Sequence, residues 1–274
     1  IEAIRKVDQR GPITVVSDEP YVAYSRPLIS YLPAGLADES QMPLRDPDFY
    51  LRNGVEPLLG MRVESLRPAS KEVELQDGSR LGYERLVVAC GGVPIRPPFM
   101  QDTAEGLFNF TTWDDAKAIA AYIEREGVKQ AVVLGGGLIG LKATEALIER
   151  RLRTTVVELA DRVLSLTFDK TASQMIEGAL ARAGGNLITG NTVVEVRRRK
   201  GKVSGVVLRD GAALDCHLLI VAIGVRPNVE PLREAGLKID PGIVTDRQMR
   251  TNLPDIYAAG DVTQAYDLLS AEQR

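Results

Sequence analysis

The stretch 131–147 reads AVVLGGGLIGLKATEAL and decides the fold class of this chain. An apolar run at 131–134 predicts a buried strand, and the amphipathic pattern after the glycines predicts a helix. Between them, Gly135, Gly137 and Gly140 have G-x-G-x-x-G spacing. The first glycine allows a tight turn, the second lets a pyrophosphate approach the backbone, and the third lets helix and strand pack closely. The positive end of the helix dipole would then face the phosphates.

An acidic residue lies where such a motif requires one. A second predicted strand at 155–157 is followed by Glu158, which lies 18 residues beyond Gly140. This is near the position expected for an acid that contacts a ribose hydroxyl. The alternative is a glycine-rich hairpin in an unrelated α/β protein. Because strand, loop, helix and acid are all readable, we expect a dinucleotide-binding unit.

Composition excludes several classes of function. The chain has 274 residues, 45% of them hydrophobic, and a formal net charge of −3. This length suits one large or two ordinary domains, and the charge offers no basis for binding nucleic acid or an anionic membrane. No apolar run is long enough to span a membrane, and residues 1–10 lack the apolar core of a signal peptide. We therefore expect a cytoplasmic globular protein.

Cysteine and histidine give little chemistry to build on. Cys90 and Cys216 are far apart and form no C-x-x-C, so neither a disulfide framework nor a metal site is expected. The single histidine, His217, precedes a predicted strand at 218–223, and we interpret it as a strand-end residue rather than a catalytic base. No residue is therefore named as catalytic.

The start of the chain resembles the glycine-loop unit. A predicted helix at 1–10 and strand at 13–16 match the helix and strand around 145–157, with EA and then TVV in both. This indicates two copies of one mononucleotide-binding βαβ unit; the alternative is chance similarity. In the first copy the strand and glycine loop are missing, because the chain starts within the helix.

Residues after this first strand are candidates for a second nucleotide site. Of Asp18 and Glu19, we expect one to hold a ribose and the other to be solvated. Residues 21–35, YVAYSRPLISYLPAG, predict an irregular loop that lines a ligand. In this loop Arg26 either meets a phosphate or is a surface arginine. A strand predicted at 86–89 runs into small residues, which let a backbone approach a ligand.

Several other elements are predicted by local signals. Thr112 and Asp115 resemble a helix cap for a helix to about Glu126, and a further helix is predicted at 169–183. Strands are predicted at 187–196 and 203–208. The basic run RRRKGK between them is expected to be a solvated hairpin tip rather than a nucleic-acid patch.

Three sequence features occurring together indicate a family. They are LVVACGG at 86–92, VVLGGGLIG at 132–140 with VAIGVRPN at 221–228, and TNLPDIYAAGDV at 251–262. This set resembles the pyridine-nucleotide-disulfide oxidoreductase superfamily of FAD- and NAD(P)-dependent flavoproteins. The resemblance covers nearly the whole chain.

The resemblance implies a branch and a fold. YSRPLIS at 24–30 and GLIGLKATEAL at 137–147 resemble rubredoxin and ferredoxin reductases, NADH oxidases and the flavin domain of assimilatory nitrite reductases. The implied fold is α/β, with two Rossmann-like, three-layer nucleotide-binding domains. Residues 1–109 and 241–274 would form an FAD domain, and 110–240 an inserted NAD(P) domain. The family also implies an FAD loop before the chain begins and an interface domain beyond its end, so we expect truncation at both ends.

The resemblance also implies cofactor-binding residues. Asp261 would bind the FAD ribitol with Gly260 allowing close approach, the strand end 89–91 would lie along FAD, and Val63 would touch the adenine. Glu19 and Arg26 match FAD-contacting positions, and the glycine loop, Glu158 and Gly224 match the nicotinamide-cofactor site. The full candidate set is Glu19, Arg26, Val63, Ala89, Cys90, Gly91, Gly135, Gly137, Ile139, Gly140, Glu158, Gly224, Gly260 and Asp261.

The implied activity is hydride transfer from NADH to FAD, followed by electron transfer to a rubredoxin- or ferredoxin-type partner, a nitrite-reducing module or oxygen. A carboxylate at Glu158 favours NADH over NADPH, although nearby Arg162 keeps NADPH open. The family is also compatible with a homodimer. The alternative is a non-catalytic nucleotide-binding fragment that lacks stable FAD.

The chain departs from its relatives in two places. Disulfide-reducing members have a reactive cysteine in the loop that here spans 23–35, where Pro27 stands instead, so reduction of the coenzyme A-disulfide or glutathione type is disfavoured. A thiol–disulfide enzyme using Cys90 is disfavoured because Cys90 lies at a strand end where the backbone would meet a cofactor. Some relatives pair a Glu after the glycine loop with a Lys in the first loop near the flavin. Here these positions are Lys142 and Tyr31, and Lys142 lies either near the flavin or on the helix surface.

Overall fold

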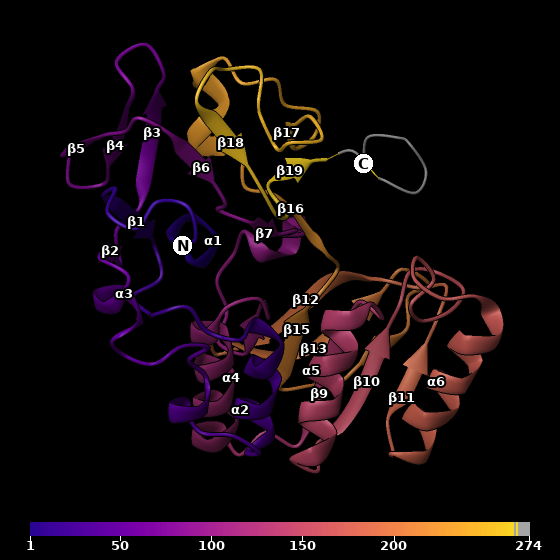
Figure 1. The fold of residues 1–274 in the computed structure, drawn as a ribbon. Coiled ribbons are helices and arrows are strands. Elements are labelled where there is room, and N and C mark those ends of the chain that lie inside the picture. The colour runs from indigo at the N-terminus through magenta and orange to yellow at the C-terminus, as the bar shows by residue number, and fades with distance from the viewer. Residues whose placement is uncertain (266, 268–274) are drawn as a thin grey trace. The chain divides into compact units, whose positions relative to one another are not determined.

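The computed structural model describes residues 1–265 and 267 and divides into two compact units (Figure 1). The first unit comprises Ile1–Tyr24, Pro43–Val93 and Arg226–Arg274, and the inserted unit comprises Ser25–Met42 and Pro94–Val225. These bounds differ from the predicted domain limits 1–109, 110–240 and 241–274. Strand β8 (Leu107–Phe108) pairs within the inserted sheet, which brings the preceding residues into that unit.

A five-stranded parallel sheet forms the centre of the inserted unit. Its order is β11-β10-β9-β15-β8. The bounds are Asn186–Ile188 for β11, Arg153–Val157 for β10, Gln130–Leu134 for β9 and Leu218–Val221 for β15. Val133, Val156 and Leu219 are fully buried, as expected where both faces of a parallel sheet are covered.

Helices and a second sheet cover the two faces of this parallel sheet. Helix α5 (Leu138–Glu149) packs on β9 and β10. A three-stranded antiparallel sheet shares a hydrophobic core with β9 and β15, and its strands are β12 (Val193–Arg199), β13 (Lys202–Leu208) and β14 (Ala213–Leu214). This arrangement confirms the predicted three-layer α/β fold for this unit.

The predicted helix cap is present. Helix α4 (Trp113–Glu126) begins after Thr112, whose side chain accepts a hydrogen bond from the Asp115 backbone, while Asp115 accepts one from the Thr112 backbone. Helix α6 (Lys170–Arg182) likewise matches its prediction. The strand predicted at 187–196 is instead divided into β11 and β12, because Gly190 turns the chain with φ +67°.

The first unit contains three separate parallel strand pairs and an antiparallel meander. Strand β1 (Ile13–Ser17) pairs with β2 (Val55–Leu59), and β6 (Leu86–Val88) pairs with β18 (Ile256–Ala258). The meander consists of β3 (Val63–Arg67), β4 (Glu72–Leu75) and β5 (Arg80–Gly82), and β17 (Ile243–Val244) pairs with β19 (Thr263–Gln264). The core of this unit is built from Leu66, Val88, Ile243, Ile256 and Val262, among others.

Two local predictions were wrong. The first helix, α1, covers only Glu2–Arg5 and buries none of its residues; Asp8 then accepts hydrogen bonds from the Arg10 and Gly11 backbones and turns the chain. The segment predicted as an irregular loop at 21–35 contains a 3₁₀ helix at Arg26–Ser30 and helix α2 (Tyr31–Ala34). Helix α2 packs on α4 and α5, and this tertiary contact stabilises a turn that local sequence does not favour.

The remaining short elements connect these parts. They are α3 (Phe49–Arg52), β7 (Gly92–Pro94), β16 (Val225–Pro227) and 3₁₀ helices at Glu39–Gln41, Pro98–Met100 and Glu230–Ala235. Within the part of the chain that the structure describes, no helix has the length and apolarity needed to cross a membrane.

The turn between β9 and α5 accepts only glycine at two positions. Gly135 has φ +111°, and a Cβ there would lie 2.3 Å from the Ala222 carbonyl oxygen. A Cβ on Gly140 would lie 1.9 Å from the Gly135 carbonyl oxygen. Both obstructing atoms belong to the backbone, so a side chain cannot be accommodated without moving the helix or the strand.

We therefore predict that Gly140→Ala lowers the free energy of unfolding by about 2–3 kcal/mol, because it overpacks a backbone contact. The single tryptophan, Trp113, is buried in α4 of this unit, so its fluorescence during urea unfolding reports the change. Gly178→Ala in α6 is the matched control, since a Cβ there meets only the flexible Arg182 side chain, at 3.3 Å. The control should be neutral or stabilising by up to about 1 kcal/mol, and equal losses in both variants would contradict the prediction.

Candidate functional site

The glycine loop lies at the carboxyl end of β9, where α5 begins. Gly137 is the N-cap residue of α5, and nothing lies within 4 Å of the position a Cβ would occupy. The backbone N–H groups of the first helical turn have no partner within the helix. Ile139, in this first turn, is 36% exposed. Open space beside unpaired N–H groups at a helix N-terminus fits a phosphate.

Glu158 is held against the glycine loop. Strand β10 pairs with β9 so that Val157 lies opposite Leu134, which places Glu158 at the same sheet edge as the loop. Its Oε2 accepts a hydrogen bond from the Gly136 N–H at 2.5 Å, and its Oε1 accepts one from the Ala160 N–H at 2.7 Å. The carboxylate therefore contacts the glycine loop directly.

Gly136 was missed in the sequence analysis. A Cβ at this position would lie 3.0 Å from the Glu158 carboxylate and 3.1 Å from Val163, so the middle glycine also makes room for the acid. The available signal was the run of three consecutive glycines, only two of which the dinucleotide motif explains.

Gly224 lies at the same sheet edge. It follows β15, which is hydrogen-bonded to β9, and the Ala222 N–H donates to the Leu134 carbonyl at 2.8 Å. Gly224 has φ +111°, a conformation that favours glycine. The structure thus brings Gly135, Gly137, Ile139, Gly140, Glu158 and Gly224 together in the inserted unit.

Arg26 and Lys142 are engaged within the inserted unit. An Arg26 terminal nitrogen donates to the Thr111 carbonyl at 2.8 Å. The Lys142 Nζ donates to Glu145 at 2.6 Å and lies 5.7 Å from the centre of the Tyr31 ring. The Glu145 carboxylate raises the pKa of Lys142 through this hydrogen bond. In this structure Lys142 lies on the exposed surface of α5 and forms an ion pair with Glu145.

In the first unit, two strand ends meet. Val88 of β6 pairs with Ala258 of β18, and the Ala259 N–H donates to the Val88 carbonyl at 2.9 Å. Residues 89–91 therefore lie beside Gly260 and Asp261. At Gly91 (φ +64°) and Gly260 (φ +80°) no atom lies within 4 Å of the place a Cβ would take, and Asp261 is exposed. Two adjacent strand ends with open glycines and a carboxylate suit a ligand rich in hydroxyl groups.

Glu19 and Val63 lie near the ends of other strands in this unit. The Glu19 side chain accepts a hydrogen bond from the Tyr24 hydroxyl at 2.5 Å, and its carbonyl accepts one from the Gly60 N–H at 3.1 Å. Asp18 is exposed, whereas Glu19 is half-buried. Val63 is the first residue of β3.

Both cysteines have raised pKa values, and the histidine lies away from the glycine loop. The Cys90 thiol donates to the Asn228 carbonyl at 3.2 Å, and desolvation raises the pKa of this thiol. Burial raises the pKa of Cys216 to about 12. His217 directly precedes β15, at the opposite strand end from the glycine loop. Among the described residues, no group of His, Cys, Asp and Glu could hold a metal ion.

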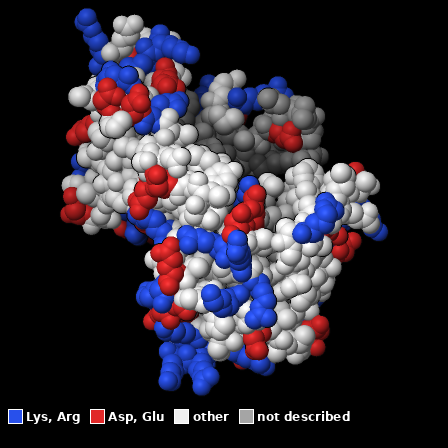
Figure 2. All heavy atoms as spheres, turned by 90° about the horizontal axis from the view of Figure 1, so that it is seen from below, with Lys and Arg blue, Asp and Glu red and all other residues white. Residues whose placement is uncertain are grey.

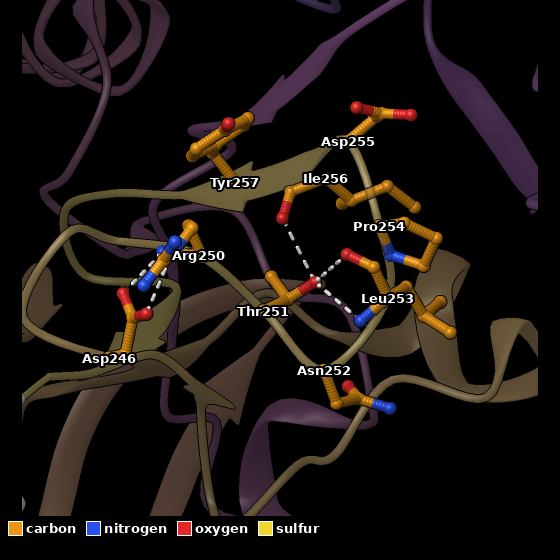
Figure 3. Close-up of a pocket in the computed structure, with 9 residues that line it drawn as sticks. All are labelled: Asp246, Arg250, Thr251, Asn252, Leu253, Pro254, Asp255, Ile256 and Tyr257. Carbon is orange, nitrogen blue, oxygen red and sulfur yellow. Dashed lines mark hydrogen bonds and ion pairs between the residues drawn. The ribbon is translucent and has the colours of Figure 1, made fainter.

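A cavity of about 320 Å³ lies on the loop that leads into β18 (Figure 3). Asp246 and Arg250 form an ion pair at 2.7 Å on one side of it. The Thr251 hydroxyl donates to the Ile256 carbonyl at 3.0 Å and accepts from the Leu253 N–H at 3.1 Å. The cavity contains none of the predicted site residues, and its polar side chains are engaged in hydrogen bonds and ion pairs, including those of Asn252 with Gly236 and of Asp255 with Lys71, so we interpret it as a structural turn.

Charged side chains of both signs are mixed on the surface. Figure 2 shows Lys and Arg beside Asp and Glu across one face, separated by neutral surface. In the basic hairpin, Lys202 pairs with Glu126 at 2.5 Å and Arg198 lies 3.7 Å from Asp102. The hairpin predicted from RRRKGK is therefore part of a mixed-charge surface.

Comparisons with known proteins agree with this geometry. The chain is 36% identical over 259 residues to NADH-dependent phenylglyoxylate dehydrogenase subunit epsilon of Aromatoleum evansii, covering 94% of this chain and 61% of that protein. It is 32% identical to a rubredoxin-NAD(+) reductase of Pseudomonas putida, covering 97% of this chain and 69% of the relative. The structure of a covalent putidaredoxin reductase–putidaredoxin complex matches with a TM-score of 0.93 and 31% identity, covering all of this chain and 66% of the reductase chain.

The chain thus spans roughly two thirds of the length of these relatives. The family described as pyridine nucleotide-disulphide oxidoreductase matches residues 1–273. Because that match extends over nearly the whole chain and includes the glycine loop, Glu158 and the Gly260–Asp261 strand end, this protein belongs to the pyridine nucleotide-disulphide oxidoreductase family.

Proposed function

We propose that this chain is the nucleotide-binding part of an FAD-dependent oxidoreductase that takes hydride from NADH and passes electrons to a redox partner. The observation that carries the proposal is the glycine loop, whose open Gly137 lies at the N-terminus of α5 beside the Glu158 carboxylate. In this proposal the inserted unit binds NADH and the first unit binds FAD.

The residues of the first unit fit the chemistry of FAD. The exposed Asp261 carboxylate would accept hydrogen bonds from hydroxyl groups of the ribitol, and Gly260 leaves space for the chain of the cofactor to approach. The strand end at 89–91 lies beside them. FAD and NADH supply the redox chemistry when bound, so the protein's own role is to bind and orient the two cofactors and to exclude water.

The acceptor is proposed to be a protein that carries electrons. Two relatives support this by name: the rubredoxin reductase of P. putida and the reductase in the putidaredoxin complex. The A. evansii relative is a subunit of a larger enzyme, which supports an acceptor or donor within an assembly as the second candidate. Both candidates require the same NADH-binding and FAD-binding residues in this chain.

The first test is the visible absorption spectrum of the purified chain before and after anaerobic addition of NADH. We expect flavin bands near the usual ~450 nm that bleach with NADH, because the flavin accepts the hydride. Asp261→Asn should lower the amount of flavin retained, whereas Asp77→Asn, in the β4–β5 turn of the same unit, should not. A colourless protein that still binds NADH would show that the chain is only a nucleotide-binding fragment.

The second test concerns thiol chemistry. Desolvation raises the pKa of Cys90, so its thiol is protonated at neutral pH and is a poor nucleophile. We predict that Cys90→Ser changes the rate of NADH-dependent ferricyanide reduction by no more than about twofold, since no thiolate takes part. Iodoacetamide treatment of the wild-type protein should have equally little effect on this rate. A large loss of activity in Cys90→Ser with its flavin retained would indicate a cysteine-dependent enzyme.

A further inference from the structure

The segment after Glu158 wraps around the glycine loop. The Leu164 N–H donates to the Gly136 carbonyl at 2.9 Å, while the Gly136 N–H donates to Glu158. Val163, between these anchor points, is fully buried, and its carbonyl accepts a hydrogen bond from the buried Ser173 hydroxyl at 2.7 Å. Residues 158–164 are therefore fixed beside the place where a nucleotide ribose would lie.

Arg162 is the single basic residue in the segment 158–165. Its guanidinium donates hydrogen bonds to other residues of the same segment. One terminal nitrogen donates to the Asp161 carboxylate at 2.9 Å, and the other donates to the Ser165 carbonyl at 3.3 Å. The Arg162 side chain is 28% exposed, whereas that of Asp161 is 76% exposed. The buried Nε of Arg162 has no hydrogen-bond partner among the described residues.

The charges of this segment would oppose a phosphate on the ribose. An arginine binds phosphate well when its planar N–H groups can face the anion together. Here both terminal nitrogens already have acceptors, and Asp161 adds a negative charge that is more exposed than the guanidinium it neutralises. Glu158 adds a second carboxylate at the end of β10.

We propose that Asp161 masks Arg162, so that the Glu158–Asp161 pair of carboxylates rejects NADPH while a phosphate-binding arginine is present but unavailable. This rests on the proposed function in one respect, namely that NADH binds at the glycine loop. Specificity of this kind comes from a repulsive element as much as from an attractive one. Asp161 and Arg162 are thus specificity-determining residues. Neutralising the two carboxylates, Glu158 and Asp161, should be enough for the chain to bind NADPH.

The test is calorimetric titration of the purified protein with NAD⁺ and with NADP⁺, which measures binding without turnover. Glu158→Gln should improve NADP⁺ affinity about tenfold, since it removes one repulsive charge, and Asp161→Asn alone should improve it about threefold. The double variant should improve it by about 100-fold, more than the product of the single effects, because only then can Arg162 face the phosphate.

Arg162 itself is tested in the background of the double variant. Adding Arg162→Met should reduce the gain to about the level of Glu158→Gln, while Arg162→Lys should keep an intermediate affinity because lysine binds phosphate as a point charge. Asp102→Asn is the matched control, since it removes another exposed carboxylate that lies beside an arginine, Arg198, in the same unit. It should leave both affinities unchanged.

The outcomes separate this inference from the proposed function. If the double variant binds NAD⁺ but gains nothing for NADP⁺, or if Arg162→Met does not reduce its gain, the masking of Arg162 is wrong and the NADH site stands. If the wild-type protein binds neither NAD⁺ nor NADP⁺, both the inference and the proposed NADH site are wrong.

Discussion

The close contact between α5 and the end of β9 is the constraint on which the rest of the inserted unit depends. Because the Gly135 carbonyl lies where a Cβ of residue 140 would be, the helix can approach the strand only if that residue is glycine. This approach points the first turn of α5 at the carboxyl edge of the sheet, and it leaves the space beside Gly137 open. The packing contact and the open space beside Gly137 are therefore two results of one turn.

Glu158 links this turn to the neighbouring strand. Its two carboxylate oxygens accept hydrogen bonds from N–H groups on either side, one from the glycine loop and one from the segment that follows β10. Charge-assisted hydrogen bonds of this type are strong, so the acid contributes to the shape of the loop as well as to the charge around it. The Asp161–Arg162 pair continues the same charged surface. Selection between nucleotides would then depend on a few charges fixed by backbone contacts.

Local sequence patterns accounted for the elements that have strong local signals. The Thr112 and Asp115 cap, the strands β9, β10 and β15 and the helix α5 were all predicted, because caps and apolar periodicity act over a few residues. The early end of α1 was not predicted, because Asp8 turns the chain through hydrogen bonds from the Arg10 and Gly11 backbones. The helical turns of Ser25–Met42 were not predicted either, because they depend on packing partners that lie far away in the chain.

The sequence by itself determined the class of fold, the position of the glycine loop and the identity of the acid that contacts it, since glycine spacing and strand ends are local properties. Only the tertiary structure decided that Ser25–Met42 packs with the inserted unit, that Gly136 makes room for Glu158, and that Arg162 is bound by Asp161 and Ser165. These contacts depend on side-chain directions and on chain segments brought together by folding, and neither is visible in residue spacing.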